Sequence, residues 1–149
     1  MKILAIDPGT VTGGWAFVED GVVVDSGHWG GHGVSSRLVD DVIKMAVFLK
    51  PDVVIVERYT AYRGRNKESQ AVAEVVGAIL YSVQSLRGRT NVFSVPYSAW
   101  NAWWKQFEIS QIAGGNPVEI DVKNEHELDA IHMALGYFYT AHARKSKGE

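Results

Sequence analysis

The sequence contains no cysteine, and this absence excludes several kinds of chemistry. A chain without thiols forms no disulfide framework, carries no thiolate nucleophile and cannot build a cysteine zinc site. Any metal site in this protein must therefore use oxygen ligands and histidine. Such ligands favour hard divalent cations.

Long apolar runs and a strong charge imbalance are missing as well. No segment is apolar over the roughly 20 residues that a membrane-spanning helix needs. The opening residues, MKILAID, carry one basic residue and reach an acid too early for a signal peptide, so we expect a buried strand, a cytoplasmic location and no membrane contact. The net charge of -2 argues weakly against nucleic-acid binding.

The composition is that of an ordinary soluble globule. The 149 residues are 46% hydrophobic and 21% charged, which fits a single domain with a core on both faces of a sheet. We see no repeat and no low-complexity linker. We therefore expect one domain over residues 1–149, ending in a short basic tail from about residue 142.

The apolar pattern predicts an α/β protein with a mixed sheet. The predicted strands are residues 2–7, 13–19, 22–26, 53–57 and 91–95, with a glycine-rich loop at 26–33. The predicted helices follow that loop over about 38–49, then cover 68–86, a short stretch capped by Ser98, and a final stretch from near Asn124. Three antiparallel strands followed by alternating helices and strands predict a five-stranded mixed sheet flanked by helices.

Three acids stand where a buried strand or helix has no structural use for them. Asp7 ends the first strand just before a Pro-Gly turn, Glu57 ends a β-branched run, and Asp129 lies in the final helix. A right-handed crossover places the first and fourth strands side by side, which brings Asp7 and Glu57 to one sheet edge. The final helix can then present Asp129 and, one turn earlier, His126.

This cluster predicts a metal site that cleaves phosphodiesters. Several carboxylates at a dry strand end, with no lysine or arginine beside Asp7, repel one another unless divalent metal compensates them. Two ions would activate the attacking water and stabilise the leaving oxygen. We predict Asp7, Glu57, His126 and Asp129 as catalytic metal ligands, with two Mg²⁺ ions per site and Mn²⁺ as a substitute. Glu125 or Glu127 is the alternative fourth ligand.

A basic, aromatic segment follows Glu57 and suits a distorted DNA backbone with an unstacked base. We predict DNA contacts here, with two further lysines near the final helix; the candidates are Arg58, Tyr59, Tyr62, Arg63, Arg65, Lys67, Lys105 and Lys123. The competing interpretation is a solvated loop.

Three segments resemble RuvC-type Holliday junction resolvases of the RNase H-like superfamily. Residues Ile3–Thr10 are similar to the family's opening strand and turn, and Val54–Glu57 to its fourth-strand glutamate. His126–Ala130 resembles its final acidic helix, which carries two metal-site residues three apart. Asp129 falls on the second of these and His126 on the first, where many members have aspartate. The similarity spans essentially the whole chain and implies an RNase H-like fold.

The resemblance also implies an activity and partners. It implies a homodimeric, magnesium- or manganese-dependent crossover junction endodeoxyribonuclease that nicks two opposed strands of a four-way DNA junction. Members often place a phenylalanine after the glutamate to wedge into the junction, whereas this chain offers Tyr59 or Tyr62. The family's basic stretch before the last helix is replaced here by residues 100–121.

Simpler explanations exist for single residues. Asp7 could start a turn, Glu57 could pair with Arg58 or a surface lysine, and His126 could be an exposed helix-start residue. His132 is expected to be a packed or surface residue. The tryptophans at 100, 103 and 104 have helical spacing, which favours core or dimer packing.

Three alternative functions stay open. The first is another RNase H-like nuclease that acts on flaps, forks or RNA-DNA hybrids. The second is one lobe of a sugar-kinase or actin-like nucleotide-binding protein, which needs two such lobes to enclose ATP. The third is a catalytically silent DNA-binding protein on the same scaffold.

Overall fold

A computed structural model describes residues 1–31, 33–59, 67–86 and 90–148, with the backbone alone for 67–69. The strands are β1 (Lys2–Asp7), β2 (Thr12–Glu19), β3 (Val22–Gly30), β4 (Val53–Arg58) and β5 (Asn91–Pro96). The helices are α1 (Val34–Leu49), α2 (Lys67–Leu86), α3 (Tyr97–Ala113) and α4 (Glu125–Ser146). No helix in the described ranges has both the length and the apolarity to cross a bilayer.

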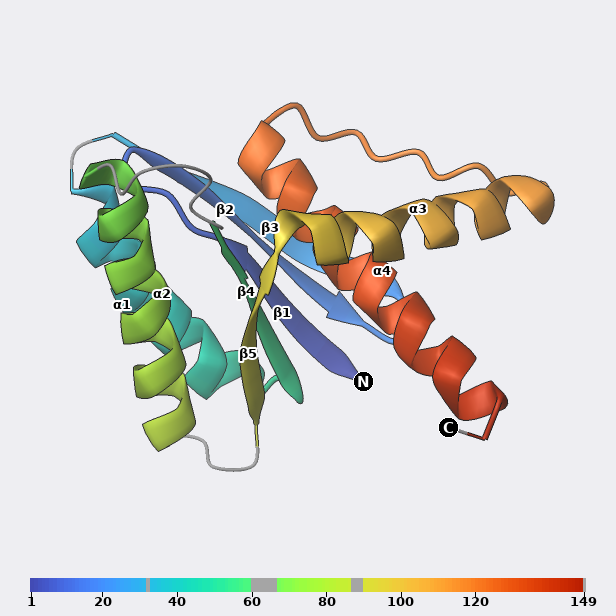
Figure 1. Cartoon of the computed structure of the whole chain (residues 1–149), viewed down its shortest axis with the longest axis horizontal. Helices are drawn as coiled ribbons and strands as arrows, with labels where there is room; N and C mark the ends of the chain where they lie inside the picture. The colour runs from blue at the N-terminus through green and yellow to red at the C-terminus, as the bar shows by residue number, and fades with distance from the viewer. Residues whose placement is uncertain (32, 60–66, 87–89, 149) are drawn as a thin grey trace.

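The five strands form one mixed sheet in the order β3-β2-β1-β4-β5 (Figure 1). The first three strands are antiparallel neighbours, and β4 and β5 continue the sheet parallel to β1. This confirms the predicted fold class and the predicted adjacency of the first and fourth strands. The register pairs Ile6 with Val56, so the next residues, Asp7 and Glu57, end neighbouring parallel strands.

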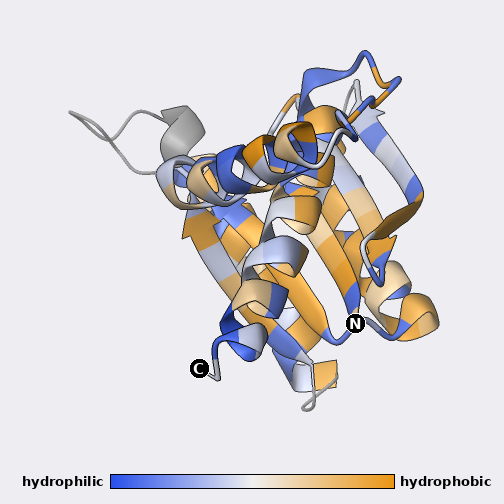
Figure 2. Cartoon of the chain, turned by 90° about the vertical axis from the view of Figure 1, so that its right-hand side faces the viewer, coloured by the Kyte–Doolittle hydropathy of each residue, from blue (hydrophilic) through white to orange (hydrophobic). Residues whose placement is uncertain are grey.

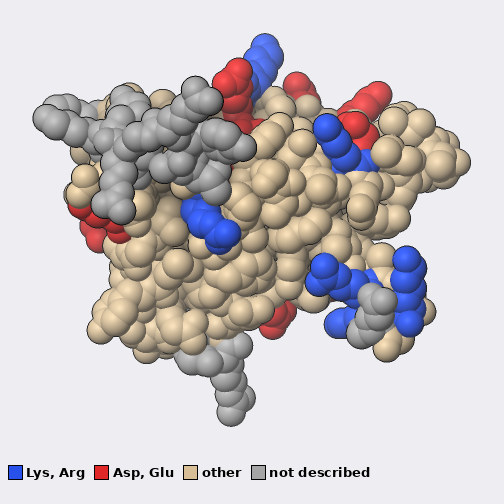
Figure 3. Space-filling model, viewed as in Figure 1, with Lys and Arg blue, Asp and Glu red and all other residues tan. Residues whose placement is uncertain are grey.

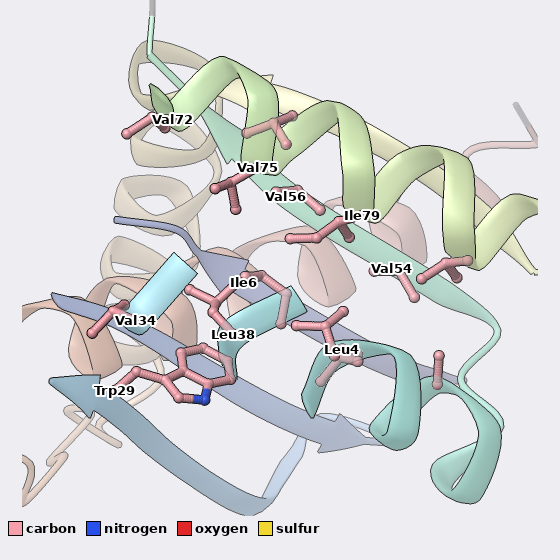
Figure 4. Packing of buried hydrophobic residues seen from close by; sticks show 14 of the residues in the cluster. Leu4, Ile6, Trp29, Val34, Leu38, Val54, Val56, Val72, Val75 and Ile79 are labelled. Carbon is pink, nitrogen blue, oxygen red and sulfur yellow. The ribbon is translucent and has the colours of Figure 1, made fainter. Parts of the chain in front are cut away.

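Each face of the sheet is covered by a pair of helices, α1 with α2 and α3 with α4 (Figure 1). Alternate residues of the central strands point to opposite faces. Leu4, Ile6, Val54 and Val56 pack against α1 and α2 (Figure 4), and the residues between them pack against α3 and α4. Hydrophobic residues are concentrated in the strands (Figure 2). Burying one large aliphatic side chain stabilises a fold by about 1.5–3 kcal/mol.

The predicted glycine-rich loop at 26–33 is wrong over its first half, because β3 continues to Gly30. The strand pairs with β2 on both sides of a bulge, so the backbone groups that face β2 bond within the sheet. Gly27 serves packing rather than a turn: a Cβ there would lie 2.6 Å from Nε1 of Trp15. Composition alone therefore misplaced the end of this strand.

Two helix predictions also need correction. The helix predicted to be short and capped by Ser98 begins at Tyr97 after Pro96 and continues to Ala113. The basic residues predicted as a tail from about 142 belong to the last turns of α4, which ends at Ser146. The final helix itself begins as predicted, because the side chain of Asn124 accepts a hydrogen bond from the backbone N–H of Glu127.

Candidate active site

Asp7 and Glu57 lie side by side and buried at the carboxyl edge of the sheet. The strand alternation that points Ile3 and Ala5 toward α3 and α4 continues to Asp7, and the same alternation in β4 places Glu57 on that face. Asp7 is only 2% exposed and Glu57 only 4%. Two carboxyl groups on adjacent strands are thus withdrawn from water together.

The start of α4 brings a third and a fourth group to this pair. Nδ1 of His126 lies 2.7 Å from Oδ2 of Asp7, a hydrogen bond that the imidazole donates when the carboxylate is ionised. Asp129 lies one turn later, close enough for its charge to act on both buried carboxyls. The four predicted site residues therefore meet, although they come from three separate parts of the chain.

Gly14 allows α4 to approach this closely. It faces Asp7 in the β1–β2 register, and a Cβ on it would lie 2.2 Å from the backbone carbon of His126 and 2.3 Å from the backbone nitrogen of Glu127. The first turn of α4 therefore rests on bare backbone of β2. Sequence reasoning missed this role, because nothing local marks a strand glycine as a helix contact.

The electrostatics of the cluster are those of uncompensated negative charge. Burial raises the pKa of Asp7 to about 7, against the lowering effect of a hydrogen bond with Glu57 and with a smaller contribution from the charge of Asp129. Burial, followed by the charge of Asp7, raises the pKa of Glu57 to about 8. Burial also raises the pKa of Asp129, against the lowering effect of His126. The cluster thus favours binding of protons or cations.

Trp100 lies beside Glu57 and partly offsets the rise in the pKa of its carboxyl group. Its indole N–H lowers the pKa of the Glu57 carboxyl, although this buried nitrogen makes no full hydrogen bond with any described residue. The side chain is 2% exposed and packs in the core beneath α3 and α4. The predicted core packing of this tryptophan is confirmed, with a polar contact to the site that its spacing did not indicate.

The donor set fits a hard divalent cation. When both buried carboxyls are ionised, Oδ1 of Asp7 is buried without a hydrogen-bond donor, which is costly unless a cation or proton compensates it. Carboxylate oxygens and one imidazole are the ligands that such ions accept. As they stand, no three His, Asp or Glu side chains of the described residues are arranged to hold one ion. Binding would therefore require these side chains to rearrange.

Glu127 is held by β3. Oγ of Ser26 donates to its carboxylate at 3.2 Å, and Nδ1 of His28 lies 3.4 Å from the other oxygen. This glutamate was an alternative fourth ligand, but His126 is the residue of that turn that contacts Asp7. His28 had no predicted role, because its partner lies 99 residues away in sequence.

The predicted DNA-contact residues other than Arg58 fall into three groups. Tyr59 is 47% exposed and close to the acidic cluster, where burial and then the negative charges of Asp7, Glu57 and Asp129 raise its pKa to about 12. Lys105 in α3 and Lys123 before α4 are exposed. Tyr62, Arg63 and Arg65 lie outside the described residues, and only the backbone of Lys67 is described.

One simpler explanation for Glu57 was an ion pair with Arg58, and the contacts of Arg58 test it. Its guanidinium donates to the backbone oxygen of Ser94 at 2.7 Å and to Oγ of the same residue at 3.2 Å. Among the described residues, no ion pair joins it to Glu57. The alternative in which these neighbours simply pair is therefore wrong.

His132 is a packed residue, as expected. Its ring stacks on Trp104 with centroids 3.8 Å apart, and burial lowers its pKa to about 4. It therefore stays neutral near pH 7 and takes no part in the acidic cluster.

The raised pKa values predict that the metal-free protein loses stability as pH rises. Unfolded carboxyls release their protons near pH 4, whereas the folded Asp7 and Glu57 keep theirs until about pH 7 and 8. Urea unfolding in EDTA should show a loss on the order of 2 kcal/mol between about pH 6.5 and 8.5. Starting at about pH 6.5 avoids the opposing contribution of His132. Magnesium should reduce this loss, and a flat profile would contradict the raised pKa values.

Comparison with solved structures supports this fold. RuvC of Thermus thermophilus in complex with a Holliday junction substrate superposes with a TM-score of 0.73 at 19% identity, covering 95% of this chain and 96% of that one. A second Thermus thermophilus RuvC structure gives 0.72 at 17% identity, covering 96% of this chain and 97% of that one. The yeast mitochondrial Holliday junction resolvase Ydc2 gives 0.64 at 14% identity, covering 97% and 80%.

No protein-family model matches the chain, and no curated protein is significantly similar to it in sequence. The likeness is therefore carried by the arrangement of the elements. It confirms, at the level of the fold, the resemblance to RuvC and the expected RNase H-like architecture.

Proposed function

We propose that the protein is a metal-dependent endodeoxyribonuclease that resolves four-way DNA junctions by paired nicks. The observation that carries this proposal is the buried pair of Asp7 and Glu57, with His126 bonded to Asp7 and Asp129 nearby. This cluster occurs in a fold whose likeness to junction-bound RuvC extends over 95% of the chain. Burying this much negative charge is a cost that a structural role does not explain.

The four side chains would hold divalent metal, with Mg²⁺ as the expected ion, Mn²⁺ as a substitute and two ions per site. The metal would supply an activated water and neutralise charge on the cleaved phosphate. Asp7 is central because it touches His126 and adjoins Glu57. His126 holds a proton at Nδ1 toward Oδ2 of Asp7, and Trp100 favours the ionised form of Glu57.

The surroundings of the cluster suit DNA. Tyr59 presents a half-exposed ring beside the carboxyls, in the place where an unstacked base could lie. Arg58, which ends β4 next to Glu57, and the exposed Lys105 and Lys123 offer positive charge. These residues would contact the strand whose phosphodiester is cleaved.

Paired nicks require two active sites, whereas one chain supplies one. We therefore include a homodimer in the proposal. Large apolar side chains on α1 and α2 are exposed, namely Phe48 at 79%, Tyr81 at 77% and Leu86 at 56%. A second copy would cover such residues and present its own carboxyl pair to the opposite strand.

The test is cleavage of a synthetic four-way junction by the purified protein with magnesium. We expect symmetric nicks in two opposed strands, none in a linear duplex of the same sequence, and none when EDTA replaces magnesium. Flaps, forks and RNA-DNA hybrids of matched length serve as competing substrates. Cleavage of these with intact junctions would contradict the resolvase assignment, and binding without any cleavage would indicate the silent DNA-binding alternative.

A further inference from the structure

A groove of about 440 Å³ lies between α3 and the C-terminal half of α4, away from the carboxyl cluster. The two helices touch at Gly136, where a Cβ would lie 2.7 Å from the backbone nitrogen of Trp104. Beyond this contact, three alanines leave space between the helices. The other lining residues are Trp103, Gln106, Thr140, Arg144 and Lys147.

The groove combines positive charge with hydrogen-bond donors. Arg144 lies in the last turn of α4 and Lys147 caps the end of that helix, and within the described part of the chain neither pairs with a carboxylate. Oγ1 of Thr140 is buried and makes no hydrogen bond with any described residue. Figure 3, viewed as Figure 1, shows lysine and arginine side chains gathered over the end of α4, with a hollow between them and α3.

A purely structural role explains the positive charge of the groove but not its other features. Basic side chains in a last helical turn interact favourably with the helix dipole. That interaction requires neither a groove nor an unpaired hydroxyl on its wall. Positive charge beside free donors is instead the chemistry that binds phosphate, and it stands out in a chain whose net charge is -2.

We propose that this groove binds the phosphate backbone of a duplex DNA arm, several base pairs from the branch point. The proposal rests on the proposed function. Asp129 and Arg144 lie fifteen residues apart on α4, which is about 22 Å along a helix. A duplex advances about 3.4 Å per base pair, so the groove meets the arm about six or seven base pairs from the cleaved phosphate.

The test combines a protein variant with a substrate variant. The double variant Arg144→Gln with Lys147→Gln removes the two cations at exposed positions. Lys44→Gln with Lys50→Gln, on the opposite helix layer, makes the same charge change and serves as the matched control. The substrates are a four-way junction with ordinary phosphates, one with neutral methylphosphonates about five to eight base pairs from the branch, and one with them about fifteen base pairs away.

Junction affinity is measured by fluorescence anisotropy without divalent metal over a range of salt concentrations. The groove variant should bind the ordinary junction about tenfold more weakly, and the slope of log affinity against log salt should fall by about two. Neutral linkages near six base pairs should weaken the wild type to a similar extent and weaken the groove variant no further. The control variant and the distant neutral linkages should leave affinity unchanged.

Two results would overturn the proposal. One is equal affinity of the groove variant and the wild type. The other is a loss that is the same for ordinary and neutralised junctions, which would mean that the two cations contact other phosphates. A wild-type protein that binds junctions without cutting them would defeat the nuclease assignment, yet these affinities would still decide the role of the groove.

Discussion

Replacing Asp7 with asparagine should reduce junction cleavage by about a thousandfold or more and, at the same time, stabilise the metal-free protein. The amide has the size of the carboxyl group but no charge to hold a cation, and the loss of a group that stabilises a phosphoryl-transfer transition state costs this order of rate. The stability gain follows from burial. At pH 8 the wild type must keep a 2% exposed carboxylate ionised beside Glu57, and the amide removes that repulsion.

Two measurements on the Asp7→Asn variant separate these effects. Single-turnover cleavage with saturating magnesium reports the rate, and urea unfolding in EDTA at about pH 8 should show a gain on the order of 2 kcal/mol. Asp40→Asn, an exposed position on α1, makes the same chemical change and should alter neither quantity. Cleavage at the wild-type rate would remove Asp7 from the site, and an unchanged or lower stability would contradict its uncompensated burial.

The pairing of Asp7 with Glu57 was predictable because it follows from the strand pattern of the sequence and from the handedness of strand connections. A β-branched run indicates a buried parallel strand, and a right-handed crossover places that strand beside the first one. Both acids stand at the carboxyl ends of their strands, so adjacency brings them together at one edge. The structure pairs Ile6 with Val56 and thereby confirms this reasoning to the residue.

The contacts that position α4 were not predictable, because they join segments remote in sequence. Gly14 looks like any strand glycine until the first turn of α4 lies on it. Ser26 and His28 appeared to belong to a loop, yet both lie in β3 and contact Glu127. The polar role of Trp100 depends on where α3 crosses the sheet, and helical spacing alone indicates only a buried side.

The helix α4 connects both proposed sites of this protein. Its first turns carry His126 and Asp129 to the buried carboxyls, and its C-terminal end carries Arg144 and the capping residue Lys147 to the groove beside α3. A rigid helix fixes the distance between these ends, so the spacing between a cleaved phosphate and a bound arm would be set by the protein. The position of α4 on the sheet is therefore central to the proposed chemistry.

This dependence makes Gly14→Ala the most informative change outside the ligands. A single methyl group would lie 2.2 Å from the backbone carbon of His126, so either the start of α4 or the strand must move by about 1 Å. A displacement of that size is expected to lower cleavage about a hundredfold. Such overpacking should cost about 1–3 kcal/mol of unfolding free energy, which leaves the protein folded for assay.

Gly30→Ala is the matched control for this prediction, because it lies in the neighbouring strand with nothing within 4 Å of its added Cβ. It should leave cleavage within about twofold of the wild type. The stabilisation that magnesium gives to each variant then distinguishes a displaced site from general loosening, since it depends on how well the ligands meet. Gly14→Ala should lose most of that stabilisation while Gly30→Ala retains it. If Gly14→Ala cleaved at the wild-type rate with normal magnesium stabilisation, the approach of α4 to β2 would not determine the geometry of the site.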